Sequence, residues 1–283
     1  MSAKGKTIIV TGGTDGIGAA TVRALANQGV NVVIVGRNRA KAEDLIADIA
    51  SETHGVKLGF VQCDLSSLAS IRAAGAEILA SQPRIDVLVN NAGGFFAKRE
   101  LTVDGYERTF ALNHLAYALL TDILLMRLKA SAPARIVSVA SGVHATGVLR
   151  FDDLMGEKRY GGWNAYCNSK LANVAGTYAL ARRLESSGVT ANTLHPGFVA
   201  SQFGKNNRGL TGMVLGFAQR FGAIGVNDGA KTSVYLATSP EVEGVSGRYF
   251  HECKETRSSS ASHDEAAQEK LWRVTEALLA KGQ

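Results

Sequence analysis

Residues 6–18, KTIIVTGGTDGIG, join a short apolar strand to a glycine-rich turn that runs into a helical pattern. Glycines in such a turn permit a tight bend and close approach of a ligand to the backbone, while the helix N-terminus offers free N–H groups to a phosphate. Because a strand precedes the turn and a helix follows it, the stretch predicts a site for the pyrophosphate of a dinucleotide. The residues of the turn that we expect at this site are Gly12, Thr14, Asp15, Gly16, Ile17 and Gly18.

The alternation of strand and helix continues along most of the chain. Longer helical patterns alternate with further short apolar runs, which lie near residues 31–36, 57–63, 85–90, 134–140 and 189–194. Strands this apolar are buried on both faces, as in a parallel sheet covered by helices. We therefore expect one α/β domain over residues 1–283, built on a doubly wound, Rossmann-like parallel sheet of six or seven strands. A last helical pattern near residues 263–281 predicts a C-terminal helical extension.

Composition is that of a globular protein and argues against a nucleic-acid partner. Apolar residues make up 46% of the 283 residues, and the formal charge of +6 is spread along the chain without a basic stripe. The first strand leaves no room for a signal peptide, and we find no long uncharged apolar run that could span a bilayer. Cys63, Cys167 and Cys253 are odd in number and lack metal-ligand spacing. We expect a cytoplasmic protein with reduced thiols, no metal and no integral membrane segment.

The end of the second predicted strand indicates which dinucleotide is bound. A site selective for NAD would have an acidic residue here to hold the ribose hydroxyls, whereas this chain has Arg37 and Asn38. A guanidinium suits a 2′-phosphate through charge-assisted hydrogen bonds, so we expect NADP(H) to be favoured over NAD(H). Asp15 argues mildly against a second phosphate nearby, and Arg37 as an ordinary surface residue is the alternative.

Two further strand ends offer groups for the rest of the cofactor. Asp64 could accept a hydrogen bond from the adenine amino group, and Leu65 could cover the ring. The fourth strand ends in Asn91, Ala92 and Gly93, which are small enough for a cofactor to lie against the backbone. Each residue could equally belong to an ordinary loop, but their occurrence at successive strand ends favours a shared site.

The stretch NAYCNSKLAN, residues 164–173, places Tyr166 and Lys170 four positions apart. On a helix a four-residue step turns about 400°, so the two side chains would project from one face. Taken alone, the pair is as compatible with two amphipathic side chains at a helix surface as with chemistry.

In their order along the chain, these motifs resemble the short-chain dehydrogenase/reductase family over nearly the whole sequence. The matching motifs are TGGTDGIG, CDL, NNAG, LNHL, IVSVAS, YCNSK and HPGFV. Within the family the chain is most similar to the retinol-dehydrogenase-like branch, through GRN after the second strand, SKLAN, and the tail SGRYFHECKE. That branch often has a membrane anchor before the first strand, and we expect none here.

The resemblance implies a catalytic tetrad of Asn113, Ser141, Tyr166 and Lys170. Tyr166 would be the general acid or base, its pKa lowered from about 10 by Lys170 and by a positive nicotinamide ring. Lys170 would also bind the nicotinamide ribose, and Ser141 would stabilise the substrate oxygen. Asn113 would kink its helix and hold a water for a proton relay, with a helix-surface asparagine as the alternative. The resemblance also places four residues near the nicotinamide, namely Pro196, Gly197, Val199 and Ser201.

Two long segments, near residues 143–163 and 198–226, are the expected walls of a substrate site. His144, Phe203, Met213 and Phe217 are the pocket residues that we expect, and they favour a lipophilic or aromatic alcohol or carbonyl. The apolar stretch at 210–225 could instead form a subunit contact, in a homodimer or homotetramer, or a peripheral membrane contact.

The predicted function is an NADP(H)-dependent oxidoreductase that interconverts an alcohol and a carbonyl on a small-molecule substrate. A dinucleotide-sensing binding protein on the same fold is the first alternative, since fold does not determine function. A lyase or epimerase that uses bound cofactor transiently is the second alternative.

Overall fold

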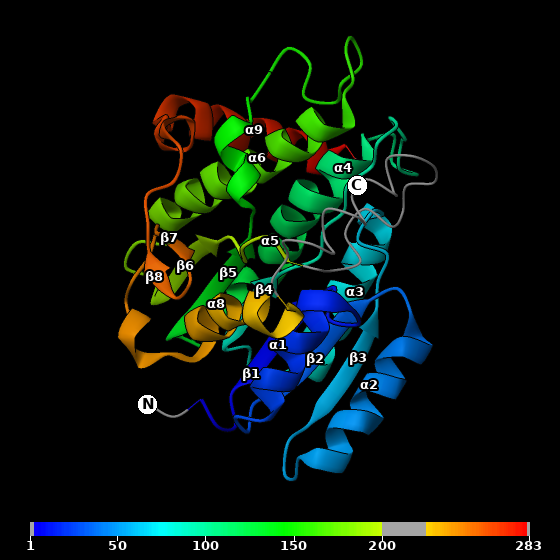
Figure 1. Cartoon of the computed structure of the whole chain (residues 1–283), viewed down its shortest axis with the longest axis vertical. Helices are drawn as coiled ribbons and strands as arrows, with labels where there is room; N and C mark the ends of the chain where they lie inside the picture. Colours follow the sequence, from blue (N-terminus) through cyan, green and yellow to red (C-terminus); the bar gives the residue numbers. More distant parts are fainter. Residues whose placement is uncertain (1–2, 200–224, 282–283) are drawn as a thin grey trace.

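An eight-stranded sheet lies between two layers of helices in the computed structural model, which describes residues 3–199 and 225–281 (Figure 1). The strand order is β3-β2-β1-β4-β5-β6-β7-β8. The first seven strands in this order are parallel, and β8 pairs antiparallel with β7. The predicted parallel α/β sheet is confirmed, with seven parallel strands.

The eighth strand, β8, is antiparallel and adds to the six or seven parallel strands that the sequence predicts. It follows a hairpin turn at Glu252 and Cys253, whose φ angles are +49° and +60°. Two consecutive residues with positive φ give the turn geometry that matches the twist of paired strands, and sequences usually mark it with asparagine or glycine. Because neither residue occurs here, the sequence did not indicate this turn.

The strands and helices have the following bounds. The strands are β1 (Thr7–Thr11), β2 (Asn31–Gly36), β3 (Leu58–Gln62), β4 (Val87–Asn90), β5 (Ala134–Val139), β6 (Val189–Leu194), β7 (Tyr249–His251) and β8 (Lys254–Glu255). The helices are α1 (Gly16–Ala26), α2 (Arg39–Glu52), α3 (Leu68–Ser81), α4 (Arg108–Phe110), η1 (Ala111–Leu115), α5 (Ala116–Ala130), η2 (Gly142–Thr146), α6 (Gly162–Arg183), α8 (Val226–Thr238), η3 (Pro240–Val242), η4 (Ser260–His263) and α9 (Glu265–Ala280).

Both faces of the sheet are covered by apolar cores, as the sequence predicts. Alternate residues of β1 point to opposite faces: Ile9 packs with Leu88 and Ile136 in one core, whereas Ile8 and Val10 pack in the other. The strand order reverses between β1 and β4, which both pair with their neighbours in parallel register. In sheets of this kind the crevice beyond the strand ends at such a reversal is where ligands bind.

The elements α4, η1 and α5 form one continuous apolar helix, Arg108–Ala130, interrupted by a π-helical turn at Ala111–Leu115. Within the described residues it is the one helix that is long and apolar enough to cross a bilayer by length and composition. The expected absence of an integral membrane segment therefore stays a prediction. However, 67% of its apolar window is buried within the fold, where α5 packs against α3. A core helix meets the same test of length and composition.

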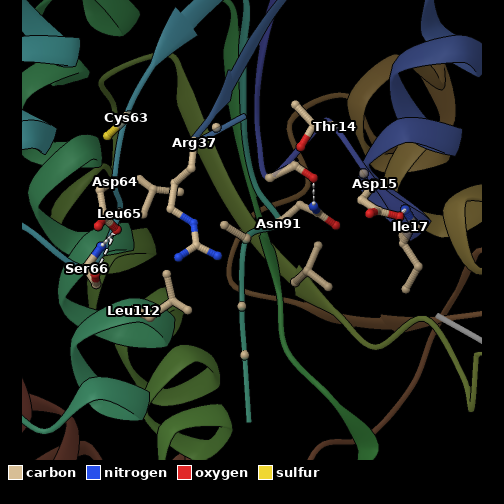
Figure 2. Close-up of a pocket in the computed structure, with 18 of the residues that line it drawn as sticks. Thr14, Asp15, Ile17, Arg37, Cys63, Asp64, Leu65, Ser66, Asn91 and Leu112 are labelled. Atoms are coloured by element: carbon tan, nitrogen blue, oxygen red, sulfur yellow. Dashed lines mark hydrogen bonds between the residues drawn. The ribbon is translucent and has the colours of Figure 1, made fainter. Parts of the chain in front are cut away.

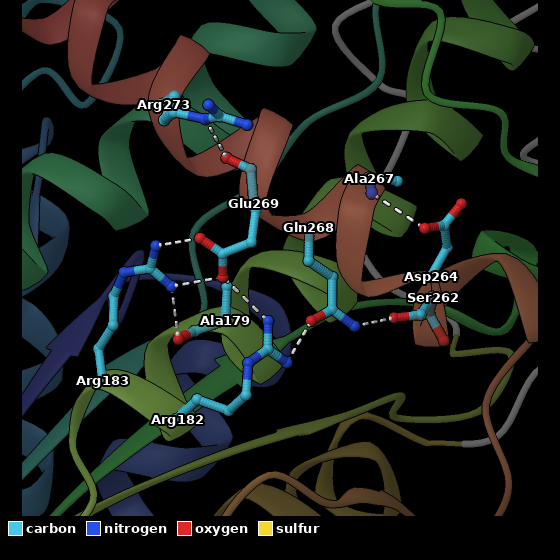
Figure 3. Close-up of polar contacts among 9 residues, drawn as sticks. All are labelled: Ala179, Arg182, Arg183, Ser262, Asp264, Ala267, Gln268, Glu269 and Arg273. Carbon is cyan, nitrogen blue, oxygen red and sulfur yellow. Dashed lines mark hydrogen bonds and ion pairs between the residues drawn. The ribbon is translucent and has the colours of Figure 1, made fainter.

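The predicted C-terminal extension is helix α9, which packs along α6. Figure 3 shows Arg182 and Arg183 of α6 reaching Glu269 of α9, with Nη2–Oε distances of 3.1 and 2.5 Å. The guanidinium of Arg183 also lies 4.2 Å from the Trp272 ring centroid. Helix α6, which contains Tyr166 and Lys170, is therefore held between the sheet and α9 (Figure 1).

Candidate active site

The glycine-rich turn after β1 places the N-terminus of α1 at the mouth of a cleft. Asp15 caps this helix, its Oδ1 accepting from the Gly16 N–H at 2.8 Å, and its Oδ2 pairs with Lys41 Nζ at 2.6 Å. A Cβ built on Gly18 would lie 2.1 Å from the Gly12 carbonyl oxygen, so no other residue fits there without movement of the backbone. The turn therefore fits a pyrophosphate held on backbone N–H groups.

We expect Gly18→Ala to destabilise the fold by about 1 to 3 kcal/mol, because the new methyl group meets backbone that cannot move aside. Gly59→Ala in β3 is the matched control, since a Cβ there has no atom within 4 Å. Urea unfolding of both variants measures the difference. Equal free energies of unfolding for the two variants would contradict this prediction, because they would show that the backbone near Gly18 moves aside without cost.

The cleft has a volume of about 500 Å³, a size that suits a small molecule or cofactor. It is lined by nearly all the residues predicted to hold the cofactor (Figure 2). The predicted residues along it are Gly12, Thr14, Asp15, Gly16, Ile17, Gly18, Arg37, Asn38, Asp64, Leu65, Asn91, Ala92, Gly93, Tyr166, Lys170 and Pro196. Gly197 and Val199 do not line it, and Ser201 lies outside the described residues. The strand ends thus converge as parallel topology requires.

Arg37 extends from the end of β2 into this cleft, in the direction of Leu112 (Figure 2). Burial tends to raise the pKa of nearby Asp64, but hydrogen bonds from Ser66 and the charges of Arg37 and Arg108 bring it below its usual value. Asp64 is consequently a carboxylate, and its Oδ1 already accepts from the Ser66 backbone and hydroxyl at 3.0 and 2.7 Å. This end of the cleft contains the charges and acceptors that an adenosine phosphate requires.

Sequence reasoning missed several groups in the cleft, chief among them two cations. Lys41 and Arg108 both line it, Lys41 from the first turn of α2 and Arg108 from the start of α4. Lys41 stands three residues after Asn38, which caps α2, so helical spacing could have indicated it. No sequence pattern near Arg108 indicates that it lines the cleft, because its position there depends on the packing of α4.

At the other end of the cleft, Tyr166 and Lys170 lie one turn apart on α6, with 8% and 3% of their surfaces exposed. Lys170 Nζ donates to the Val139 carbonyl at 3.0 Å and lies 5.7 Å from the Tyr166 ring centroid. The Ser141 side chain lies near enough to the Tyr166 phenol to oppose the rise in its pKa that burial causes. This burial beside the cleft excludes the alternative of two amphipathic side chains at a helix surface.

Burial dominates the pKa of both groups in the protein alone. It raises the pKa of Tyr166, with Ser141 opposing the rise, and it lowers the pKa of Lys170 to about 7. Lys170 was expected to lower the pKa of Tyr166. In the protein without cofactor it does not, and burial raises that pKa instead. Desolvation disfavours both charges, and a lysine with a pKa near 7 is charged only in part at neutral pH.

Asn113 lies in the π-helical turn and is fully buried. Its Oδ1 accepts from the Gly94 N–H at 2.8 Å, and its Nδ2 donates to the Gly94 carbonyl and to Ser169 Oγ at 3.0 and 2.9 Å. The expected irregularity of the helix is present, and a surface asparagine is excluded. Asn113 thus ties the end of β4 to α6, while its water relay stays a prediction.

The aromatic side chains around Tyr166 are a further feature that the sequence did not indicate. Phe95 and Trp163 lie with ring centroids 6.2 and 6.1 Å from that of Tyr166. Phe203, Met213 and Phe217 fall within 200–224, outside the described residues. His144 is buried at 4% exposure and hydrogen-bonds within the protein, so its place in a substrate pocket stays a prediction.

The chain is similar to one known protein family and to several named proteins, and all of these are dehydrogenases. A family described as short chain dehydrogenase matches residues 6–209. Retinol dehydrogenase 14 of Mus musculus is 42% identical over 97% of this chain and 86% of its own length. Polyprenol dehydrogenase of Homo sapiens is 40% identical over 94% of this chain and 83% of its own length.

Comparison with solved structures agrees. A protein of Mycobacterium paratuberculosis has a TM-score of 0.78 and 29% identity, covering 99% of this chain and 95% of that one. A short chain dehydrogenase of Burkholderia cenocepacia, solved in complex with NADP, has a TM-score of 0.71 and 27% identity, covering 88% and 97%.

Proposed function

Because the chain belongs to the short-chain dehydrogenase/reductase family, in its retinol-dehydrogenase-like branch, we propose that it interconverts an alcohol and a carbonyl with NADP(H). The observation on which this rests is a single cleft with the glycine turn and Arg37 at one end and Tyr166 and Lys170 at the other. The cofactor's phosphates fit the first end and its nicotinamide the second, since both ends are lined by the residues that each part requires.

The nicotinamide supplies the hydride acceptor or donor when the cofactor is bound. In the oxidation direction Tyr166 Oη takes the proton from the substrate hydroxyl, and in reduction it returns a proton to the carbonyl oxygen. Ser141, whose side chain lies near the phenol, donates to the same substrate oxygen. Lys170, held by the Val139 carbonyl, binds the ribose and favours the phenolate.

The substrate class is an apolar alcohol or its carbonyl. Phe95 and Trp163 surround the Tyr166 ring, and 49% of Trp163 remains exposed to contact a substrate. Retinol and polyprenols, which give the relatives their names, are alcohols of this kind. Cytoplasmic localisation and a homodimer or homotetramer stay predictions.

The test is a panel of lipophilic and aromatic alcohols and aldehydes, assayed for turnover of NADPH or NADP⁺ by the purified protein. Stoichiometric change of cofactor and substrate supports the oxidoreductase. Cofactor binding without turnover of any member would favour the binding protein, and conversion of one substrate without net cofactor change would favour the lyase or epimerase.

We expect Arg37→Ala to weaken NADP(H) binding by about 1.5 to 3 kcal/mol, roughly 10- to 150-fold, and to leave NAD(H) binding nearly unchanged. The reason is the loss of a charge-assisted contact to the 2′-phosphate. Arg39→Ala is the matched control, because Arg39 stacks on Phe60 and does not line the cleft. Fluorescence titration of both cofactors measures the effect, and tighter binding of NAD(H) than NADP(H) by the wild type would refute the assignment.

A further inference from the structure

Behind the cleft, His144 links the backbone of Ser141 to the C-terminal part of the chain. Its ring Nδ1 lies 2.8 Å from the Ser141 carbonyl oxygen, and its Nε2 lies 3.1 Å from the Ser259 backbone nitrogen. The same carbonyl also accepts from the His144 backbone N–H at 3.0 Å. Two donors from one residue therefore fix the Ser141 peptide group.

The partners determine the tautomer of His144. A backbone N–H can only donate, so Nε2 must be unprotonated, and a carbonyl oxygen can only accept, so Nδ1 must bear the hydrogen. Burial lowers the pKa of this histidine and keeps the ring neutral. His144 is thus a neutral Nδ1–H imidazole with both nitrogens in use.

Tyr249 extends the same network to the next strand. Its hydroxyl lies 3.2 Å from His144 Nδ1 and 2.7 Å from His195 Nδ1. Since His144 Nδ1 bears a hydrogen, the Tyr249 hydroxyl donates to His195. His195 precedes Pro196, which lines the cleft, so the network connects the loops after β5 and β6.

The segment that contains Ser259 is itself held by hydrogen bonds to α6 and α9. Ser258 Oγ lies 2.7 Å from Tyr178 Oη of α6 and 3.0 Å from His263 Nε2. Figure 3 shows the continuation, where Gln268 of α9 donates to the Ser262 carbonyl at 2.7 Å. The Ser259 N–H is therefore a fixed donor.

We propose that His144 is a positioning residue that orients Ser141 toward the Tyr166 phenol and the substrate oxygen through its Nδ1–H bond to the Ser141 carbonyl. The inference rests on the proposed function for the role of Ser141 itself. The Ser141 side chain lies near the Tyr166 phenol, whose pKa it lowers, so rotation of the Ser141 peptide group would misdirect its hydroxyl. A misplacement of about 1 Å at a reacting group costs on the order of 100-fold in rate.

Two substitutions distinguish the hydrogen bond of His144 Nδ1 from that of His144 Nε2. His144→Asn places an amide N–H near the position of Nδ1, keeping the bond to Ser141 and losing Ser259, whereas His144→Gln places its amide near Nε2 and loses the bond to Ser141. We expect His144→Gln to lower kcat about 10- to 100-fold with cofactor affinity unchanged, and His144→Asn to recover kcat to within about threefold of wild type. His263→Asn is the control, since it loses the Nε2 bond to Ser258 and so loosens the same C-terminal segment without contact to Ser141; it should keep kcat within about twofold.

Equal losses of kcat in the two His144 variants, or no loss in either, would overturn the proposal. The tautomer is tested separately by long-range ¹H–¹⁵N correlation spectra of histidine-labelled wild-type protein, with His144 assigned by its disappearance in His144→Asn. An Nδ1–H pattern at neutral pH supports the network, and an Nε2–H pattern overturns it. Because this spectrum needs no turnover, failure of the inference is distinguishable from failure of the proposed reaction.

Discussion

Tyr166→Phe is expected to lower kcat by about 10²- to 10⁴-fold while cofactor affinity stays near wild type. The substitution keeps the ring that packs against Phe95 and Trp163 but removes the only proton that the phenol can exchange with the substrate. Steady-state turnover, with cofactor binding measured separately by titration, tests it.

Tyr106→Phe is the matched control for that experiment. Its hydroxyl, like that of Tyr166, belongs to a buried ring, and it donates to the Leu278 carbonyl at 2.6 Å away from the cleft. This variant should lose some stability and keep its turnover. If Tyr166→Phe turns over a wild-type substrate at a near wild-type rate, Tyr166 is not the general acid or base and the proposed mechanism is wrong.

Lys170→Met is expected to impair turnover and cofactor binding together, yet to stabilise the cofactor-free protein near neutral pH. Turnover falls because the charge that favours the phenolate and the ribose contact are both lost. Stability rises because burial lowers the pKa of Lys170 from 10.5 to about 7, so that folding disfavours the ammonium.

The size of this stability effect depends on pH. The cost of burying the charge is fully present below about pH 7 and disappears as pH rises toward 10.5, where the unfolded chain also loses its proton. The gain from Lys170→Met, on the order of a few kcal/mol, should therefore be large at pH 6.5 and small at pH 9.5. Thermal unfolding at both values measures it, with exposed Lys254→Met as control. A gain independent of pH would show that the lysine is not desolvated.

The two substitutions should also be strongly non-additive. Tyr166 and Lys170 act on one proton transfer, so the double variant should lose much less turnover than the product of the single losses.

The sequence predicted the cleft well because parallel strands end at one edge of the sheet. Arg37, Asp64 and Asn91 are far apart in the chain, yet each follows a strand, and the topology alone brings them to one crevice. Groups that reach the cleft from helices, such as Arg108, depend on helix packing and gave no local pattern.

The network around His144 was unpredictable for a related reason. Ser141, His144, Tyr249 and Ser259 come from three separate segments, and no motif spacing relates them. A short polar stretch can be recognised as a loop from its composition, but the direction of a buried imidazole depends on partners more than a hundred residues away.

Helix α9 has a consequence for the order in which the protein matures during translation. The ribosome completes all eight strands before it makes α9, so a nascent chain can form its sheet while α6 still lacks the Arg183–Glu269 pair and the Arg182–Gln268 contact. The Ser259 donor to His144 also emerges after the last strand. Premature termination near residue 256 would therefore yield a chain with every motif of the cleft but without α9 and without the Ser259 N–H that bonds His144. We expect such a fragment to be less active than the whole chain, because its α6 lacks the contacts to α9.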